Sequence, residues 1–230
     1  MTAKIYIVLL SLMTLLFSCR KEKTTANTQA SEAKSKTEAP KQLPGESNSE
    51  SAEPIFSSTG KTTKDFIPKH YRIDLEAEGD LNLDGLQDEV IVLMKTKDST
   101  AQRTAIVLLK QKDNSYRLDA KSVGIIEPKY RDNGFLNYDY ENIKIEKNGQ
   151  LVITQQAMGP NGNIESTYQY IKNELVLSHI STFNMGAGGQ TELKLNLLKG
   201  IAEETNINTM EEEMPSETTT KQYRIGKVLF

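Results

Sequence analysis

The segment Ile143-Lys144-Ile145-Glu146-Lys147-Asn148-Gly149-Gln150-Leu151-Val152-Ile153 places apolar and polar residues in alternation on both sides of an Asn-Gly pair. Successive side chains of a β-strand point to opposite faces of the sheet, so a period of two predicts two half-buried strands. Asn148-Gly149 is a strong signal for a two-residue type I′ turn, in which both central residues need positive φ. The segment therefore predicts an antiparallel β-hairpin.

The same period of two recurs along most of the chain after residue 64. Continuous apolar runs at Val90–Met94 and Ala105–Leu109 have strand length and predict central strands. Asp113-Asn114, Gly159–Gly162 and Lys172-Asn173 supply turn residues between alternating segments. The alternating positions are Tyr71, Ile73, Leu75, Ala77, Tyr168, Tyr170, Leu175, Leu177, Leu193, Leu195 and Leu197.

Helical spacing with caps at both ends is not found after residue 60. The acidic stretch Ile201–Met214 is compatible with a short helix, and a solvated loop is the favoured interpretation. Residues 61–230 are therefore predicted to form one all-β domain, an antiparallel meander of hairpins arranged as a sandwich or an open barrel-like sheet. About nine to eleven strands are expected.

The N-terminal segment carries a targeting pattern. Lys4 precedes an apolar run, Ile5–Phe17, that is shorter than the ~20 residues a membrane-spanning helix needs and fits the apolar part of a secretory signal. Cys19, the only cysteine of the chain, follows at once. With Leu16 and Ser18 before it, the segment resembles a bacterial lipoprotein signal. The resemblance implies that residues 1–18, a signal helix, are removed and that Cys19 is acylated with fatty acids such as palmitate. An ordinary signal peptide with an incidental cysteine is the alternative.

Residues 19–60 form the predicted tether. Polar residues dominate this stretch, so it buries too little apolar surface to offset its chain entropy and is expected to be disordered. Arg20-Lys21-Glu22 follows the cysteine without an aspartate, which resembles the sorting pattern of outer-membrane rather than inner-membrane lipoproteins. The expected location is the cell envelope, lipid-anchored and facing the periplasm or the cell surface.

Residues 80–88, Asp-Leu-Asn-Leu-Asp-Gly-Leu-Gln-Asp, carry oxygen side chains at positions 1, 3, 5 and 9 and glycine at position 6. Calcium binds six to eight oxygen ligands, and a loop can supply them from alternate residues. An EF-hand would need glutamate at position 12, where Ile91 stands. The loop instead resembles the calcium loop of FG-GAP and VCBS-type β repeats. That resemblance implies a structural Ca²⁺ held by Asp80, Asn82, Asp84, the Leu86 carbonyl and Asp88. A metal-free turn rich in Asp and Asn is the alternative.

The order of features also resembles an uncharacterised group of Gram-negative lipoproteins. Phe66-Ile67-Pro68, the Asn148-Gly149 hairpin and Asn196-Leu197-Leu198-Lys199-Gly200 carry this resemblance. It implies a calcium loop joined to a β domain and carries no known activity.

Several signals of catalysis and of nucleotide binding are missing from the sequence. His70 and His179 are the only histidines, and no phosphate-binding loop, dinucleotide fingerprint or His/Cys cluster is present. His179 is expected on one face of a strand, and Gly186–Gly189 is expected to be a flexible loop rather than an anion site. The formal net charge is −3 with no basic patch, so nucleic acid is not an expected partner.

The densest aromatic group consists of Tyr130, Phe135, Tyr138 and Tyr140, interleaved with acidic residues. Exposed aromatic rings beside carboxylates can stack on sugars or contact a partner protein, although such residues also fill the edges of cores. The expected function is a non-catalytic binding or scaffold role for a glycan or protein ligand. The alternative is a hydrolase, or a hydrolase accessory, that uses Asp and Glu residues.

Overall fold

Twelve strands and one 3-10 turn make up the regular structure of residues 54–159 and 162–230, which are the residues described by the computed structural model. The predicted signal segment, Cys19 and the tether as far as residue 53 lie outside this range. No helix in the described residues is long and apolar enough to cross a bilayer. The elements are β1 (Thr59–Gly60), η1 (Thr63–Phe66), β2 (Tyr71–Gly79), β3 (Asp88–Lys95), β4 (Thr104–Lys110), β5 (Tyr116–Val123), β6 (Tyr140–Ile145), β7 (Gln150–Gln156), β8 (Asn163–Ile171), β9 (Glu174–Gly186), β10 (Gly189–Asn196), β11 (Ile201–Asn208) and β12 (Ser216–Gln222).

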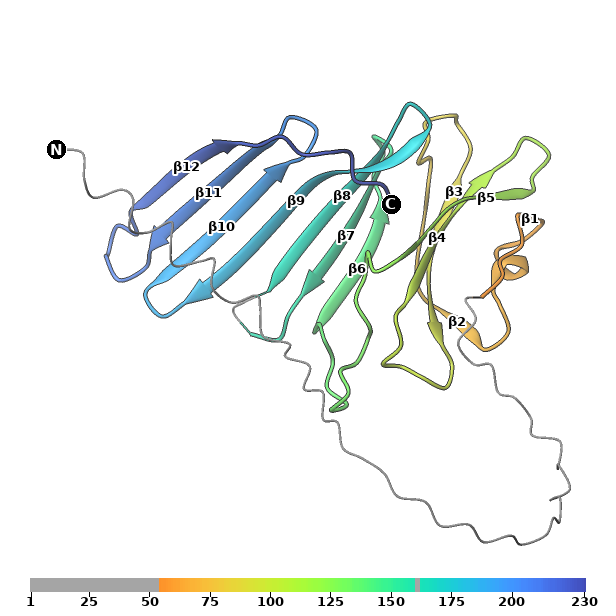
Figure 1. The fold of residues 1–230 in the computed structure, drawn as a ribbon, viewed down its shortest axis with the longest axis horizontal. Helices are drawn as coiled ribbons and strands as arrows, with labels where there is room; N and C mark the ends of the chain where they lie inside the picture. Colours follow the sequence, from red (N-terminus) through yellow and green to blue (C-terminus); the bar gives the residue numbers. More distant parts are fainter. Residues whose placement is uncertain (1–53, 160–161) are drawn as a thin grey trace, which may run out of the picture. The chain divides into compact units, whose positions relative to one another are not determined.

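The strands form two antiparallel sheets (Figure 1). A five-stranded sheet has the order β1-β5-β4-β3-β2, and a seven-stranded sheet has the order β12-β11-β10-β9-β8-β7-β6. Apart from β1, neighbouring strands are consecutive in the sequence, so the predicted all-β meander is confirmed. The twelve strands exceed the expected nine to eleven, and one of them, β11, forms in the acidic stretch that was predicted as a loop. Thr59 and Gly60 pair with β5 as β1, so the folded domain begins before residue 61.

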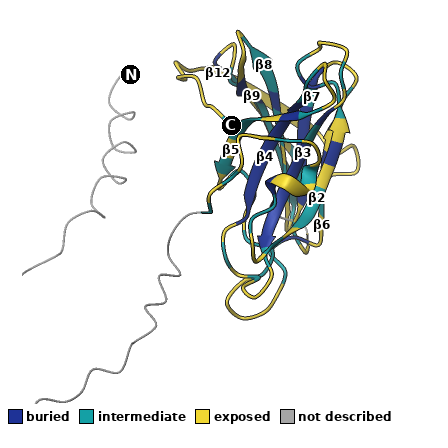
Figure 2. Cartoon of the chain, turned by 90° about the vertical axis from the view of Figure 1, so that its right-hand side faces the viewer, coloured by how far each residue is buried: buried dark blue, intermediate teal, exposed yellow. Residues whose placement is uncertain are grey.

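One apolar core lies between the two sheets. Val90, Val92 and Val107 contribute to it from the five-stranded sheet, and Leu151 and Ile153 contribute from the seven-stranded sheet. Figure 2 shows β3, β4 and β7 as the most deeply buried strands. Shared burial of this kind identifies the sandwich form of the prediction as the correct one.

The other face of the five-stranded sheet has a smaller core of its own. Phe66 of η1 is buried against Ile91, Leu93 and Ile106, and Phe56 packs at the margin of this cluster. Because β3 and β4 are covered on both faces, their sequences read as continuous apolar runs rather than as alternations.

The edge strands of the two sheets, β2 and β6, lie against each other. At the ends of β2 and β6, a Cβ added at Gly79 would come within 2.7 Å of the Ile145 side chain, so the two backbones approach closely. Further along the same two strands, the fully buried Arg103 guanidinium binds Asp74 of β2, at 2.7 Å, and Glu141 of β6. Buried charges are tolerated when they are paired in this way, and these pairs hold the two edges in register.

The seven-stranded sheet extends beyond the shared core. Its core residues come from β6 to β9, whereas β10, β11 and β12 continue the sheet past the five-stranded one (Figure 1). Near the start of β9 the place beside the strand is taken by residues 228–230. Leu177 donates to the Val228 carbonyl at 2.9 Å, and the Phe230 ring meets Tyr168 edge to face at 5.5 Å.

The Asn148-Gly149 hairpin forms, but the predicted turn type is wrong. Gly149 has a φ of 74°, Asn148 has no positive φ, and the Gly149 amide donates to the Glu146 carbonyl at 2.9 Å. The loop thus has three residues, a type I turn followed by glycine in the left-handed conformation. The two-residue turn with positive φ at both positions occurs at Lys172 (51°) and Asn173 (65°) instead.

The acidic stretch predicted as a loop or short helix contains a strand. β11 alternates Ile201, Glu203, Thr205 and Ile207 on one face, and Glu203 lies directly opposite Lys194 of β10. β-branched residues favour an extended backbone, and the pairing of opposite charges across strands removes the repulsion that the sequence alone suggests.

Gly149 should be intolerant of a side chain for two reasons. A Cβ there would lie 2.9 Å from the Leu81 carbonyl oxygen and 2.9 Å from the Leu83 Cγ, and its φ is positive. Gly149→Ala is expected to lower the free energy of unfolding by about 2–3 kcal/mol, measured by urea denaturation.

Gly134→Ala is the matched control. Gly134 also has a positive φ, 82°, but a Cβ there would meet nothing within 4 Å. Gly134→Ala should therefore lower the free energy of unfolding by only about 1 kcal/mol, from backbone strain. Equal losses for the two variants would contradict the close approach at Gly149.

Candidate functional site

The loop 80–88 connects β2 to β3, and its polar side chains fold inward onto the backbone. Asp80 accepts hydrogen bonds from the amides of Asp84 (3.0 Å) and Gly85 (2.8 Å). Asn82 Oδ1 accepts from the Asp84 amide at 3.0 Å, and Asp84 Oδ1 accepts from the Leu86 amide at 2.9 Å. Asp80, Asn82 and Asp84 therefore direct their oxygens to the interior of one tight turn.

Asp88 has a different role from the other acidic residues of the loop. Its side chain is 0% exposed, and its oxygens accept from the amides of Leu81 (2.9 Å), Asn82 (3.3 Å) and Lys110 (2.9 Å). Burial raises the pKa of the Asp88 carboxyl, and the three amides partly offset this effect. Asp88 closes the loop and joins it to the end of β4.

The predicted calcium ligands fit a cation in part. Asp80, Asn82 and Asp84 bring hard oxygens together, as a calcium loop requires. Asp88, the predicted ligand at position 9, is instead occupied by backbone amides. Among the described residues, no group of three or more His, Cys, Asp or Glu side chains is arranged to hold a metal ion. The same hydrogen bonds are those of an Asx-rich turn, so the chemistry of the donor set is compatible with both predicted alternatives.

The loop packs against the β6–β7 hairpin of the other sheet. A Cβ added at Gly149 would collide with Leu81 and Leu83, which belong to the loop. Leu83 itself has a φ of 61°, which is uncommon for leucine and is held by this packing. The loop thus connects three elements: β3, the end of β4 and the β6–β7 turn.

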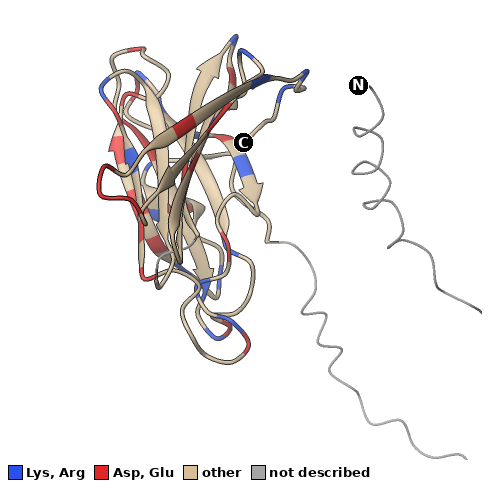
Figure 3. Cartoon of the chain, turned by 90° about the vertical axis from the view of Figure 1, so that its left-hand side faces the viewer, with Lys and Arg blue, Asp and Glu red and all other residues tan. Residues whose placement is uncertain are grey.

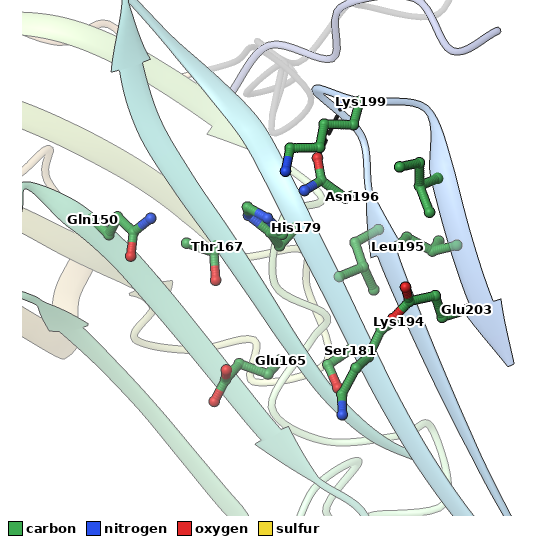
Figure 4. A pocket seen from close by; sticks show the side chains of 12 residues that line it. Gln150, Glu165, Thr167, His179, Ser181, Lys194, Leu195, Asn196, Lys199 and Glu203 are labelled. Carbon is green, nitrogen blue, oxygen red and sulfur yellow. Dashed lines mark hydrogen bonds between the residues drawn. The ribbon is translucent and has the colours of Figure 1, made fainter. Parts of the chain in front are cut away.

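A groove of about 540 Å³ lies on the face of the seven-stranded sheet that points away from the shared core (Figure 4). Register places Thr167, His179 and Asn196 side by side across β8, β9 and β10. Glu165, Ser181, Lys194 and Glu203 form the next outward-facing row. A second hollow shares Gln150, Glu165 and Thr167 with the groove and reaches Lys144 on β6. Ile180, Leu195 and Ile201 also line the groove, so its surface is mixed, whereas the second hollow is mainly polar. The two together make an elongated surface across the strands.

Two ion pairs lie on this face, and the groove is also lined by the charged side chains of Glu165, Lys199 and Glu203. Lys144 lies 2.7 Å from Glu146, and Lys194 lies 2.8 Å from Glu192. The His179 Nδ1 is 3.0 Å from the Ser178 hydroxyl. The surface of the groove thus presents amide, hydroxyl and imidazole groups together with charged groups of both signs.

The predicted aromatic group does not act as a unit. Tyr138 is only 9% exposed, and burial, followed by Glu127, raises its pKa, so the side chain of this residue fills a core edge. Phe135 (65% exposed) lies in the turn before β6, and Tyr130 is half-buried. Tyr140 (50% exposed) shares an outward-facing register position with Gln156 at the margin of the polar face.

Two further sequence predictions can be placed. His179 lies on one face of β9, as expected, and is half-buried in the groove. Gly186–Gly189 is a tight hairpin, with Gly186 directly opposite Gly189, rather than a flexible loop. Gly188, with a φ of 94°, allows the reversal between β9 and β10.

No protein-family model matches the chain, and neither the curated proteins nor the solved structures include a match.

The groove residues were mostly missed by sequence reasoning. Glu165 and Thr167 lie on β8, Lys194 lies on β10 and Lys199 lies in the β10–β11 turn, and only the strand register brings them together. The available signal was the regular polar alternation along β8, β9 and β10, which marks an outward face without saying that it is hollowed.

Proposed function

We propose that this protein is a lipid-anchored lipoprotein of the cell envelope, outer membrane rather than inner, whose β domain binds a linear, uncharged glycan. The observation that carries the binding role is the elongated groove across the seven-stranded sheet, which is lined by many polar side chains. Cys19 at the end of the apolar signal-like run supports the anchor.

A glycan suits this groove better than a protein partner does. Protein interfaces usually have an apolar centre enriched in aromatic residues, whereas here the aliphatic Ile180, Leu195 and Ile201 lie among amides, hydroxyls and charges of both signs. Sugars hydrogen-bond to such groups, and the exposed Tyr140 offers a ring for stacking at the margin. The length of the groove, from Lys144 to Glu203, suits a chain of several sugar units.

The loop 80–88 supports a structural calcium ion in this proposal. Asp80, Asn82, Asp84 and the Leu86 carbonyl would hold it, and Asp88 would keep the loop closed from behind through its three amides. A bound ion would stiffen the β2–β3 connection and supply no catalytic chemistry.

A hydrolase is the weaker candidate. Two carboxylates with different pKa values in one cleft would favour it, but Asp74 and Glu141, the buried pair in the described residues, are both bound by Arg103. Glu165 and Glu203 lie in the groove without any such burial.

Calcium should stabilise the domain weakly. For a dissociation constant of about 10⁻⁴–10⁻³ M, 10 mM calcium adds about 1–3 kcal/mol and raises Tm by about 3–10 °C over the value in EDTA. Asp84→Ala should abolish this shift in differential scanning calorimetry. An unchanged Tm for the parent protein on adding calcium would identify a metal-free turn.

Asp88→Ala separates the closing of the loop by Asp88 from the proposed binding of calcium by Asp80, Asn82 and Asp84. It leaves one buried and two partly buried amides without an acceptor, so it should cost about 3 kcal/mol in EDTA as well as in calcium. Asp84→Ala, in an exposed position, should cost about 1 kcal/mol in EDTA.

Binding is tested by titrating linear neutral oligosaccharides, such as oligomers of N-acetylglucosamine and of β- and α-linked glucose, into the protein while following amide NMR shifts. Shifts should cluster on β7 to β10. His179→Ala should weaken binding about tenfold by removing a hydrogen bond at the centre of the groove. Lys112→Ala, in the β4–β5 turn, is the control that should leave affinity unchanged. Shifts spread over both sheets, or none with any oligomer, would refute the glycan assignment.

The anchor is tested in cells. Labelled palmitate should enter the protein and remain after denaturing gel electrophoresis, and Cys19→Ala should remove both the label and the membrane association. A Cys19→Ala protein that stays in the membrane fraction would contradict the anchor without affecting the groove.

A further inference from the structure

β12 ends the seven-stranded sheet with an open edge. All seven of its residues, Ser216–Gln222, are exposed, and β11 is the only described strand that pairs with it. The other sheet edges are covered or short: β2 and β6 lie against each other, and β1 has two residues. β12 lies at the left of Figure 1, and Figure 3 views the molecule from that side.

The direction of the free backbone groups follows from the pairing with β11. The Asn208 amide donates to the Pro215 carbonyl at 2.9 Å, and the Tyr223 amide donates to the Gly200 carbonyl at 2.7 Å. Antiparallel strands alternate between residues that bond to one neighbour and residues that bond to the other. Odd-numbered residues of β12 therefore face β11. The amides and carbonyls of Ser216, Thr218, Thr220 and Gln222 face outward.

Two opposite charges stand at equal distances from the centre of this strand. The sequence Ser216-Glu217-Thr218-Thr219-Thr220-Lys221-Gln222 has Glu217 and Lys221 equally far from Thr219, with threonine on both sides. Neither charged side chain has an ion-pair partner among the described residues. Like charges would keep a second strand away, whereas opposite charges about a centre attract an identical strand that runs in the opposite direction.

We infer that β12 is a self-association edge, at which a second copy of this chain pairs antiparallel about a two-fold axis through Thr219. In this register Glu217 lies opposite Lys221 of the other copy on one face of the sheet. Thr218 lies opposite Thr220, and Ser216 lies opposite Gln222, so each outward-facing amide and carbonyl meets its counterpart. The seven-stranded sheets of both copies then form one continuous sheet.

Other arrangements fit less well. Moving the axis to Thr218 or Thr220 keeps the hydrogen-bonding residues opposite each other but shortens the overlap and separates Glu217 from Lys221. A parallel pairing in register would place Glu217 against Glu217. The contact is confined to one strand, so it is smaller than a standard stable interface, and a weak, reversible dimer is expected.

The register is tested by disulfide cross-linking of the full chain in membranes. Across the axis the two Thr219 residues form a non-hydrogen-bonded pair with Cα atoms about 4.5 Å apart, within the range that a disulfide spans. Thr219→Cys should therefore give a covalent homodimer under mild oxidation. Thr218→Cys is the matched control because its two copies would lie about 7–8 Å apart and should link poorly. The unsubstituted chain, with Cys19 alone, gives the background.

Charge exchange provides the second measurement, in the Thr219→Cys chain. Glu217→Lys alone and Lys221→Glu alone each set like charges opposite one another and should lower the yield of dimer about fivefold or more. A mixture of these two variants, or the double exchange in one chain, should restore it.

Three outcomes would overturn the inference. The first is equal cross-linking of Thr218→Cys and Thr219→Cys, which would indicate random collision. The second is no dimer above background. The third is cross-linking of Thr219→Cys to a different protein in place of a second copy.

Discussion

One apolar layer, shared by the two sheets, is the constraint on which the rest of the domain depends. It covers one face of each sheet, and Phe66 and its neighbours cover the second face of β3 and β4. The buried Arg103, held between Asp74 and Glu141, fixes where the adjoining edges meet. β10 to β12 lie beyond this layer and depend mainly on hydrogen bonding to their neighbours. Stability should therefore decline from β7 towards β12.

Local pattern was sufficient to predict most strands but not their detailed connections. The continuous runs at Val90–Met94 and Ala105–Leu109 gave the buried strands directly, because burial on both faces demands apolar residues throughout. Turn type was not predictable from a dipeptide. Asn148-Gly149 forms a three-residue loop, and the space around Gly149 is limited by Leu81 and Leu83, which are distant in the sequence. β11 was missed because the partners of its acidic residues lie on β10.

The two candidate sites differ in how far a sequence can reveal them. The loop 80–88 is contiguous, so residue type and spacing indicated it without a structure. The function of Asp88 within it depends on the Lys110 amide at the end of β4, which spacing cannot show. The groove is assembled from at least five strands whose relative register is set by hairpins and by an irregularity between Thr167 and Tyr168. A register slip of one residue would turn His179 toward the core.

The contact between the loop and the β6–β7 turn has a consequence for how the two sites communicate. Leu81 and Leu83 touch Gly149, and the adjacent Asn148 and Gln150 line the polar hollow on the far side of the sheet. A change of shape in the loop would thus act through a single turn on the surface where we propose that a glycan binds. Thermodynamic linkage is reciprocal, so an ion that tightened ligand binding through this turn would itself be held more firmly, by the same factor, once the ligand was in place.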